Sequence, residues 1–408
     1  MKTLRLFYVI GFLRGLYLYL PIFTVYLTSK SIGLEWVVFA QTFYSVAQFA
    51  FEIPTGVFAD RFGQRFSMVI GFFIEALGIL SVVFLPNVIG LCLCYAIGGL
   101  AAAFLSGSEE ALFYENAAQD KIAHGPAYGR YLSNQTIGMV AATAFGGFAF
   151  ALWGVAVSVP LLVGTSLALF VCAFLASFVR DVVASDASKQ EGSTMSKTLR
   201  KAFGTIKRDD LLRTMTIVFT LIISGEYFLY NAYQPIFEET QVPAFWFGLA
   251  ISFGLALNAL VTRHIHRLEK YLTLERILVI ISLLMAVGYL VLWISSSAIV
   301  SVLAVILVLG FVESYRPIVS DFLNERIESD TRVTVLSGMS FAQRVANAIL
   351  RVALTFAIAW GGMRAGVLFQ GVYLVIGAVI SYWLLIRCGC AHRIEKHQPS
   401  YAVEHVPQ

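Results

Sequence analysis

Charged residues are scarce in this sequence. Of its 408 residues, 13% are Asp, Glu, Lys or Arg, whereas 58% are hydrophobic. A water-soluble domain carries roughly 25% charged residues, so the low charge content excludes an ordinary soluble protein. The net charge of +4 forms no basic stripe of the kind that follows phosphates. We therefore expect no nucleic-acid partner.

Cysteine is also rare, and the common catalytic motifs are missing. Three of the five cysteines lie inside apolar runs, where cysteine behaves as a small hydrophobic residue, and the spacing is not that of a disulfide framework. Cys388, Cys390 and His392 could bind a soft metal, but two cysteines at a helix end are the simpler interpretation. The sequence has no Walker loop, no His-Glu-x-x-His and no Gly-x-Ser-x-Gly. We expect no enzyme activity, no drive by ATP, no metal and no cofactor.

Long apolar runs make up most of the chain. A helix that crosses the hydrocarbon core of a membrane needs about 20 apolar residues. The first run is too long for a signal peptide, and no Ala-x-Ala-like site follows it. The runs predict twelve spans, at approximately 4–27, 34–58, 66–85, 88–114, 132–152, 157–179, 213–237, 244–262, 273–295, 298–322, 334–360 and 364–387.

The spans predict an all-α membrane protein of two six-helix bundles. Lysine and arginine gather in the loops on one side of the predicted membrane, and Lys30 and Arg364 are the cations in loops on the other side. Because cationic loops remain in the cytoplasm, both termini are expected to be cytoplasmic. The predicted parts are an N-terminal bundle over 1–182, a linker over 183–212, a C-terminal bundle over 213–390 and a tail over 391–408.

The linker alternates basic and apolar residues between Lys197 and Arg213. This pattern suits a helix that lies on the inner leaflet with its cations toward anionic lipids. A solvated helix that touches no membrane has the same pattern, and the sequence leaves both open.

The most specific motif joins spans two and three. Residues 56–65 have the sequence Gly-Val-Phe-Ala-Asp-Arg-Phe-Gly-Gln-Arg. This segment resembles the signature of the major facilitator superfamily (MFS), Gly-x-Leu-Ala-Asp-Arg-x-Gly-Arg-Lys, and the six-plus-six topology agrees over nearly the whole chain. The resemblance, which extends to bacterial efflux permeases for drugs and small molecules, implies a transporter of the bacterial cytoplasmic (inner) membrane. Its two bundles would open a central cavity alternately to each side.

The same resemblance implies a gating role for this turn, because in the family the motif locks the outward-open state. A glycine admits a close neighbouring helix, a carboxylate accepts hydrogen bonds from a helix N-terminus, and a second glycine can adopt a positive φ. Gln64 replaces the usual arginine, and the counterpart turn at 263–270 lacks Asp-x-x-Gly, which predicts a one-sided latch. The gating candidates are Gly56, Asp60, Arg61, Gly63, Arg65 and Glu115.

Span five carries small residues at Gly138, Ala142, Thr143, Gly146 and Gly147. Exporters of the superfamily tend to show Gly-x-x-x-Gly-Pro-x-x-Gly-Gly there. The spacing is kept here and the proline is not. The pattern favours export weakly, and close helix packing by small residues explains it nearly as well.

Ionisable side chains inside the spans are the remaining signal. Each costs about 2.5–3.5 kcal/mol at the membrane centre, so each must face a cavity or a partner. The substrate-cavity candidates, which fall on helical stripes, are Arg14, Tyr17, Glu109, Glu110, Tyr230, Gln234, Arg316, Arg344, Asn347 and Arg351. The arginines could bind an anionic group or pair with glutamates. Glu75 lies in span three, which is often peripheral in this fold, and has no assigned role.

The proton-coupling candidates are Glu226, near the middle of span seven, and then Glu52 and Glu313. No histidine lies in a span, so a histidine relay is not expected. The predicted function is proton-coupled export (antiport) of a small molecule by a monomer in contact with membrane lipids. One alternative is a proton symporter that takes up an organic anion or zwitterion. The other is a transport-inactive receptor or assembly factor, which would need no protonatable stripe.

Overall fold

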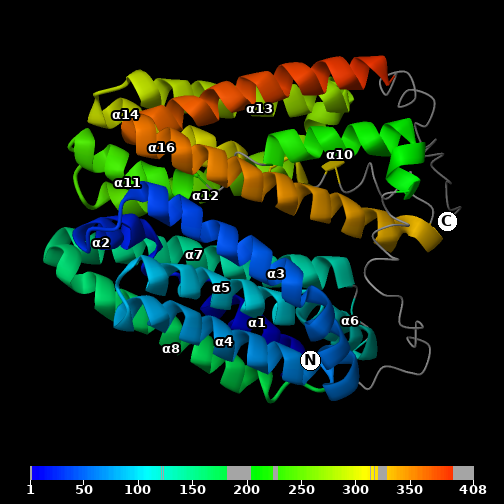
Figure 1. Ribbon diagram of the computed structural model, residues 1–408. Helices are drawn as coiled ribbons and strands as arrows, with labels where there is room; N and C mark the ends of the chain where they lie inside the picture. The colour runs from blue at the N-terminus through cyan, green and yellow to red at the C-terminus, as the bar shows by residue number, and fades with distance from the viewer. Residues whose placement is uncertain are drawn as a thin grey trace, which may run out of the picture.

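The chain forms two helical bundles that lie side by side (Figure 1). This computed structural model describes residues 2–120, 122, 124–181, 204–223, 228–312, 314–316, 318–319 and 329–388, and the elements described there are all helices. Helices α1 to α8 build one bundle and α10 to α16 the other. Helix α1 begins and α16 ends at the same end of the molecule, which we call the inner end. The opposite end, which holds Lys30 and Arg364, is the outer end.

The first bundle follows the predicted spans closely. It consists of α1 (Lys2–Arg14), η1 (Leu20–Ile22), α2 (Phe23–Ser29), α3 (Leu34–Phe62), α4 (Gln64–Phe84), α5 (Val88–Leu105), α6 (Ser108–Gln119), α7 (His124–Trp153), η2 (Gly154–Val157) and α8 (Ser158–Ala176). The first predicted span is broken into α1, η1 and α2, and the fourth is divided between α5 and α6.

The second bundle repeats this arrangement. It consists of α10 (Asp210–Ile223), α11 (Leu229–Glu239), α12 (Trp246–His264), η4 (Ile265–Lys270), α13 (Leu274–Ile294), α14 (Ala298–Phe311) and α16 (Ser329–Arg387). Helix α16 covers the last two predicted spans and breaks at Gly362, where φ is 72°. Each of the twelve predicted spans overlaps a described helix. The predicted tail, and the linker from residue 183 to residue 203, lie outside the described residues.

Two helix breaks have local causes. Pro21 lacks an N–H and its ring would clash with the carbonyl of residue 17 of a continuous helix, which favours a break or a kink at this place. Gly107 has a φ of 79° and separates α5 from α6. A glycine adopts this backbone conformation without steric cost. The second break places Glu109 and Glu110 in the first turn of α6, where the helix dipole favours negative charge.

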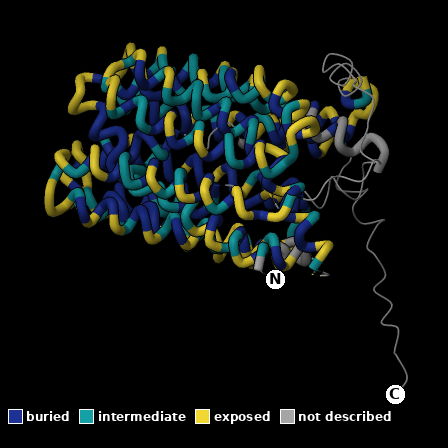
Figure 2. Tube along the Cα trace, turned by 90° about the horizontal axis from the view of Figure 1, so that it is seen from below, coloured by how far each residue is buried: buried dark blue, intermediate teal, exposed yellow. Residues whose placement is uncertain are grey.

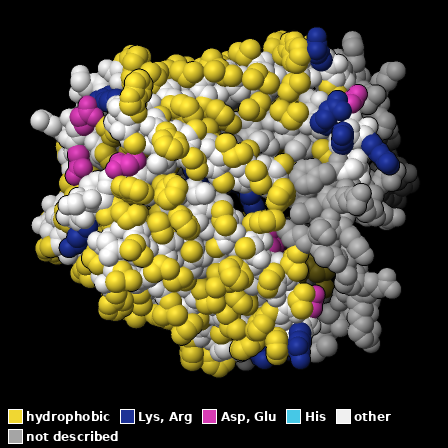
Figure 3. All heavy atoms as spheres, viewed as in Figure 1, with side chains coloured by type: hydrophobic (Ala, Val, Ile, Leu, Met, Phe, Trp, Pro, Cys, Tyr) yellow, Lys and Arg dark blue, Asp and Glu magenta, His cyan; other side chains and the backbone are white. Residues whose placement is uncertain are grey.

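The outside of the molecule is apolar. Hydrophobic side chains cover both bundles, and the visible charged groups lie mainly toward the two ends (Figure 3). Exposed residues run along the outer helix faces while the inner faces are buried (Figure 2). Among the described residues, six stretches are long and apolar enough to cross a membrane, and two of these, of 51 and 50 residues, each hold two predicted spans. The protein is an integral membrane protein.

Candidate functional site

A cavity of about 1030 Å³ lies between the two bundles. It extends from Tyr19 and Phe23, near the outer end, to Thr262 and Arg263 at the inner end of α12. Side chains of both bundles line it, among them Tyr17, Gln41, Tyr95, Tyr230, Asn231 and Asn258. Aromatic rings offer faces for stacking, and amides fix the orientation of polar groups. The lining therefore suits a small amphipathic molecule.

A polar recess of about 510 Å³ adjoins this cavity and shares Gln41 and Tyr95 with it. Its cationic and amide lining contains four of the predicted cavity residues: Arg316, Arg344, Asn347 and Arg351. The other predicted residues that line one of the two spaces are Tyr17 and Tyr230. The tertiary structure thus brings residues of α11, of α16 and of the segment after α1 to one continuous pathway.

Two arginines of α16 bridge the bundles within this recess. Arg344 forms an ion pair with Glu52 on α3, with 2.7 Å between Nη1 and Oε2. Arg351 donates to the backbone oxygen of Gln41 and to the hydroxyl of Ser45, both at 2.8 Å. The Arg344 and Glu52 side chains are 25% and 39% exposed, so the pair is partly solvated. Of the proton-coupling candidates, Glu52 is described and has this cation as its partner.

The outer end of the cavity is closed by contacts between α2 and α11. Gln234 Oε1 accepts from the backbone N–H groups of Thr24 and Val25, at 2.8 and 3.2 Å. Its Nε2 donates to the oxygen of Leu20, and the Tyr233 hydroxyl donates to the oxygen of Pro21. Because Gln234 is fully buried and has these partners, it belongs to the closure and not to the cavity lining.

Helices α7 and α12 meet across the bundle boundary at glycines. A Cβ added to Gly147 would lie 2.5 Å from the nitrogen of Gly248, and the Thr143 and Ser252 hydroxyls are 2.9 Å apart. Gly138 fits in the same way against the oxygen of Phe12 in α1, and Gly146 against the oxygen of Leu18 in the segment that follows α1. The predicted packing role of the span-five pattern is confirmed. This packing is independent of the direction of transport.

A buried charge cluster lies inside the first bundle. Arg14 forms an ion pair with Glu109, whose other carboxylate oxygen accepts from the Tyr131 hydroxyl. The Tyr17 hydroxyl donates to Glu75 Oε1 at 2.8 Å. The side chains of Arg14 and Glu109 are 22% and 8% exposed, whereas Glu110 is exposed at the start of α6. Arg14 and Glu109 thus face each other within the bundle.

The turn between α3 and α4 has the predicted backbone. Gly63 has a φ of 97°, and a Cβ there would lie 2.7 Å from Asp181 Oδ2. Arg65 approaches the same carboxylate, with 3.8 Å between Nε and Oδ2. Asp60 and Arg61 are exposed, and Gly56 has no neighbouring atom within 4 Å of an added Cβ. The acid beside Arg65 is therefore Asp181, and among the described contacts Glu115 forms no hydrogen bond or ion pair with the turn.

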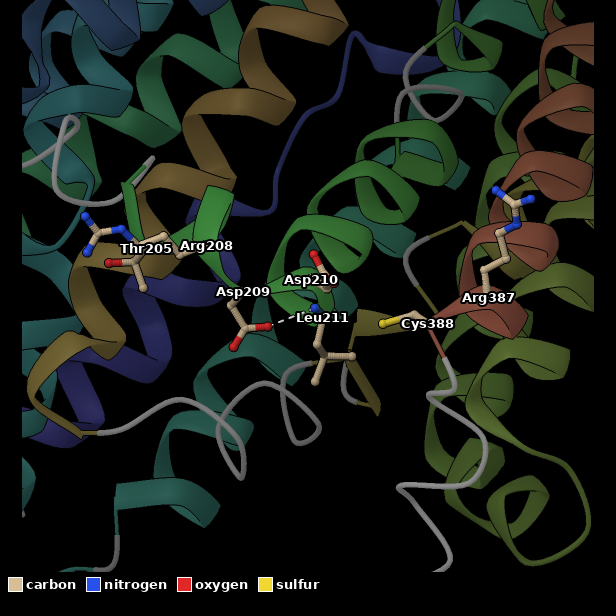
Figure 4. A pocket seen from close by; sticks show the side chains of 7 residues that line it. All are labelled: Thr205, Arg208, Asp209, Asp210, Leu211, Arg387 and Cys388. Atoms are coloured by element: carbon tan, nitrogen blue, oxygen red, sulfur yellow. Dashed lines mark hydrogen bonds between the residues drawn. The ribbon is translucent and has the colours of Figure 1, made fainter.

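A shallow recess at the inner end lies outside this pathway (Figure 4). Asp209 caps α10 by accepting from the backbone N–H groups of Leu211 and Leu212, at 2.8 and 3.1 Å. Arg387 lies over the ring of Trp383, with its guanidinium carbon 4.0 Å from the ring centre. These groups are accounted for by helix capping and by stacking.

Sequence reasoning did not identify two acidic residues, Glu75 and Asp181. For two of the acidic residues that it did identify, the structure gives no information. Glu226 and Glu313 lie outside the described residues. Glu75 has no predicted role, because span three is often peripheral in this fold. A carboxylate inside an apolar span is nevertheless a functional signal by itself. Asp181 follows the last residues of span six and has no distinguishing pattern around it.

Two pseudo-equivalent helical bundles with a polar cavity between them are the architecture of a secondary transporter. A family profile, Major Facilitator Superfamily, matches residues 7–349. The chain belongs to this family, whose members are transporters and not enzymes.

Two curated relatives are similar in sequence. One is the uncharacterized MFS-type transporter YxaM of Bacillus subtilis (strain 168), 23% identical over 405 residues, covering 92% of this chain and 94% of that protein. The other is an uncharacterized transporter of Buchnera aphidicola subsp. Schizaphis graminum, 35% identical over 99 residues, covering 24% of this chain and 25% of that protein.

Solved structures share the fold. The nucleoside transporter NupG has a TM-score of 0.74 at 14% identity, covering 96% of this chain and 100% of that chain. The inward open conformation of the xylose transporter XylE from E. coli has a TM-score of 0.67 at 15% identity, covering 93% and 95%. At these identities the likeness concerns the fold alone.

Proposed function

We propose that this protein is a proton-coupled exporter, an antiporter, of a small amphipathic molecule in the bacterial cytoplasmic membrane. The amphipathic cavity between the bundles carries the proposal. It is closed at the outer end by the Gln234 contacts and reaches Arg263 at the inner end. Bundle 1–182 rocks against bundle 213–390, with both termini in the cytoplasm, and the cavity then faces each side in turn.

The contacts between the bundles support this motion because each of them can break and form again while both bundles stay folded. They comprise hydrogen bonds around Gln234, glycine packing at Gly147 and Gly248, and a partly solvated ion pair between Glu52 and Arg344. Such contacts can break without unfolding either bundle. Export is the direction expected from the resemblance to bacterial efflux permeases, because the packing of the small residues on α7 favours neither direction.

The proposed substrate carries a ring and an anionic group. The rings of Tyr17, Tyr95 and Tyr230 suit stacking, and Arg344 and Arg351 lie in the adjoining recess. The nucleoside and sugar transporters with the same fold also move small polar molecules. The coupling proton is assigned to the predicted carboxylates Glu226, Glu52 or Glu313, and the turn at residues 56–65 acts as the gate.

The test begins with a strain that lacks the protein, screened against toxic ring-containing acids, zwitterions and dyes. A compound that becomes more toxic is then added to inverted vesicles that have an acidic interior. An antiporter releases protons from these vesicles as it accumulates the compound. Accumulation in cells, driven by an inward proton gradient, would instead mean uptake by symport. The absence of flux in both orientations would favour the remaining alternative, a transport-inactive receptor or assembly factor.

A further inference from the structure

The cluster in the first bundle has an unbalanced charge. Arg14 is its guanidinium, and Glu109 and Glu75 are its carboxylates. Glu109 forms the ion pair with Arg14, while Glu75 interacts with Arg14 through the electrostatic field and accepts from Tyr17. One cation cannot neutralise two carboxylates, and an uncompensated charge is costly away from water. A bound proton would restore neutrality.

Two buried atoms of the cluster lack a hydrogen-bond partner among the described residues. They are Nε of Arg14, a donor, and Oε2 of Glu75, which is an acceptor when ionised and carries the proton when protonated. An unpaired buried polar atom costs about 1–3 kcal/mol. A movement of Arg14 from Glu109 toward Glu75 would bring this donor and this acceptor together, which would give the cluster a second arrangement.

Tyr17 connects this cluster to the cavity. Its side chain lines the cavity, and its hydroxyl donates to Glu75 Oε1. A hydroxyl both donates and accepts, so it can pass a proton between cavity water and the carboxylate. Glu75 and Glu109 are not among the residues that line the cavity, and Tyr17 is thus the link between the cavity and the cluster in the described part of the chain.

The cluster also adjoins the broken part of the first span. Arg14 is the last residue of α1, and the segment that follows leads through Pro21 to α2. The other end of that segment is held by Gln234 of the second bundle. The segment from Arg14 to Thr24 thus connects the cluster to the outer closure.

Several titratable groups on neighbouring helices face the cluster. They are Tyr19 on the broken segment, Tyr44 on α3, Glu110 on α6, Tyr128 and Tyr131 on α7, and Cys172 on α8. None of these groups is a cation. Arg344 and Arg351 of α16 also act on Tyr44, but they bind Glu52 and Ser45, so Arg14 is the cation that pairs with a carboxylate of the cluster.

We propose that Glu75 is a proton-binding residue, loaded from the cavity through Tyr17, while Arg14 alternates between Glu109 and Glu75. When Glu75 holds the proton, Arg14 pairs with Glu109. When Glu75 loses its proton to cavity water, Arg14 moves to share the two carboxylates and pulls on the segment before α2. The role of this site in transport rests on the proposed function, whereas proton binding does not.

Infrared titration of the purified protein in lipid tests proton binding without a known substrate. The wild type should show the C=O stretch of a protonated, buried carboxylic acid, which disappears as the pH rises. Glu75→Gln should lose this band, and Glu75→Asp should keep it at a shifted position. Glu35→Gln, at the partly exposed outer start of α3, should leave it unchanged. A band that persists in Glu75→Gln with an unchanged titration would overturn the proposal.

The route is tested by a pH jump. Tyr17→Phe should keep the Glu75 band but slow its response at least about tenfold, since a positioned proton relay contributes about 10²–10⁴-fold. If the Glu75 band responds to the pH jump as fast in Tyr17→Phe as in the wild type, the proton does not pass through Tyr17. Thermal unfolding in the same lipid checks that each variant is folded. If the wild type shows the Glu75 band but its flux ignores a pH gradient in vesicles, proton-coupled transport fails and the binding site stands.

Discussion

Gln234 on α11 accepts a hydrogen bond from the backbone N–H of Thr24 on α2, 2.8 Å away across the boundary between the two bundles. Thr24 is the second residue of α2, and the residue before this helix, Ile22, supplies no side-chain cap. The first N–H groups of a helix lack partners within it and need an external acceptor. One bundle therefore caps a broken helix of the other, and the cap exists while the outer end is closed.

Replacement of Gln234 by Leu should open the outer end. The change removes three hydrogen bonds across the boundary, each worth about 0.5–1.5 kcal/mol. Since 1.4 kcal/mol is about tenfold in population, the closed population should fall at least about tenfold. Spin labels at the exposed Lys30 and Glu238 report the distance across the closure. Tyr233→Phe should shift the distribution less, and Thr240→Val, whose hydroxyl bonds within α11, should not shift it.

Gly147→Ala should weaken the same closed state by a different mechanism. The added methyl group would meet the backbone of Gly248 at 2.5 Å, and overpacking of this kind costs about 1–3 kcal/mol. Gly129 is on the same helix and has open space around it, so Gly129→Ala is the matched control. Label distances should change in Gly147→Ala alone, while both variants insert and unfold normally. If the label distances are the same in Gly147→Ala and Gly129→Ala, α7 and α12 do not pack tightly at Gly147.

Glu52 and Arg344 should show a small but measurable coupling. Because their side chains are 39% and 25% exposed, we expect at most about 1 kcal/mol from the pair. Glu52→Gln and Arg344→Gln should each change the distance between labels at the inner ends of α3 and α16. The double variant should resemble either single variant, and the exchanged pair Glu52→Arg with Arg344→Glu should restore the wild-type distance. Fully additive effects would mean that the pair does not link the bundles.

Arg364 should stabilise the second bundle rather than regulate transport. Its guanidinium binds Glu239 at 2.9–3.1 Å and donates to the oxygens of Leu292, Trp293 and Ser295 at the end of α13. Arg364→Gln should lower the melting temperature, at a cost of about 1–3 kcal/mol for hydrogen bonds to a charged group. Arg364→Lys should recover part of this loss, because an ammonium lacks the planar fork. Lys30→Gln, at the other predicted outer cation, should lower the melting temperature less, because Lys30 contributes a cation–π contact at 5.9 Å from the Tyr26 ring centre.

The helices, and the division into six spans before and six after the linker, follow from the sequence. Apolar runs of sufficient length can only be spanning helices, because the membrane core leaves backbone groups no other partner. The positive φ of Gly63 also follows from the local sequence. A tight turn between two antiparallel helices needs a residue with positive φ, and glycine adopts it without steric cost. The break at Pro21 is equally local, although the first apolar run predicts one uninterrupted span.

The site was predicted in part. A stripe of polar residues on α3 and one on α16 indicate faces that avoid lipid. Arg344, Asn347 and Arg351 line the recess, and their role in substrate binding stays a prediction. The partners of these residues were not predictable. Arg14 meets Glu109 and Arg65 meets Asp181 across more than ninety residues of chain. Helical spacing defines a face and gives no information on the face opposite.

Composition and hydropathy by themselves determined that this chain is a membrane protein of two helical bundles, because lipid forces each apolar segment to form its own hydrogen bonds. The tertiary structure alone decided which polar groups meet: that Gln234 caps α2, that glycines let α7 and α12 touch, and that Arg14 pairs with Glu109. These contacts depend on the rotation and depth of packed helices, which the interlocking of side chains fixes and the period of a single segment does not.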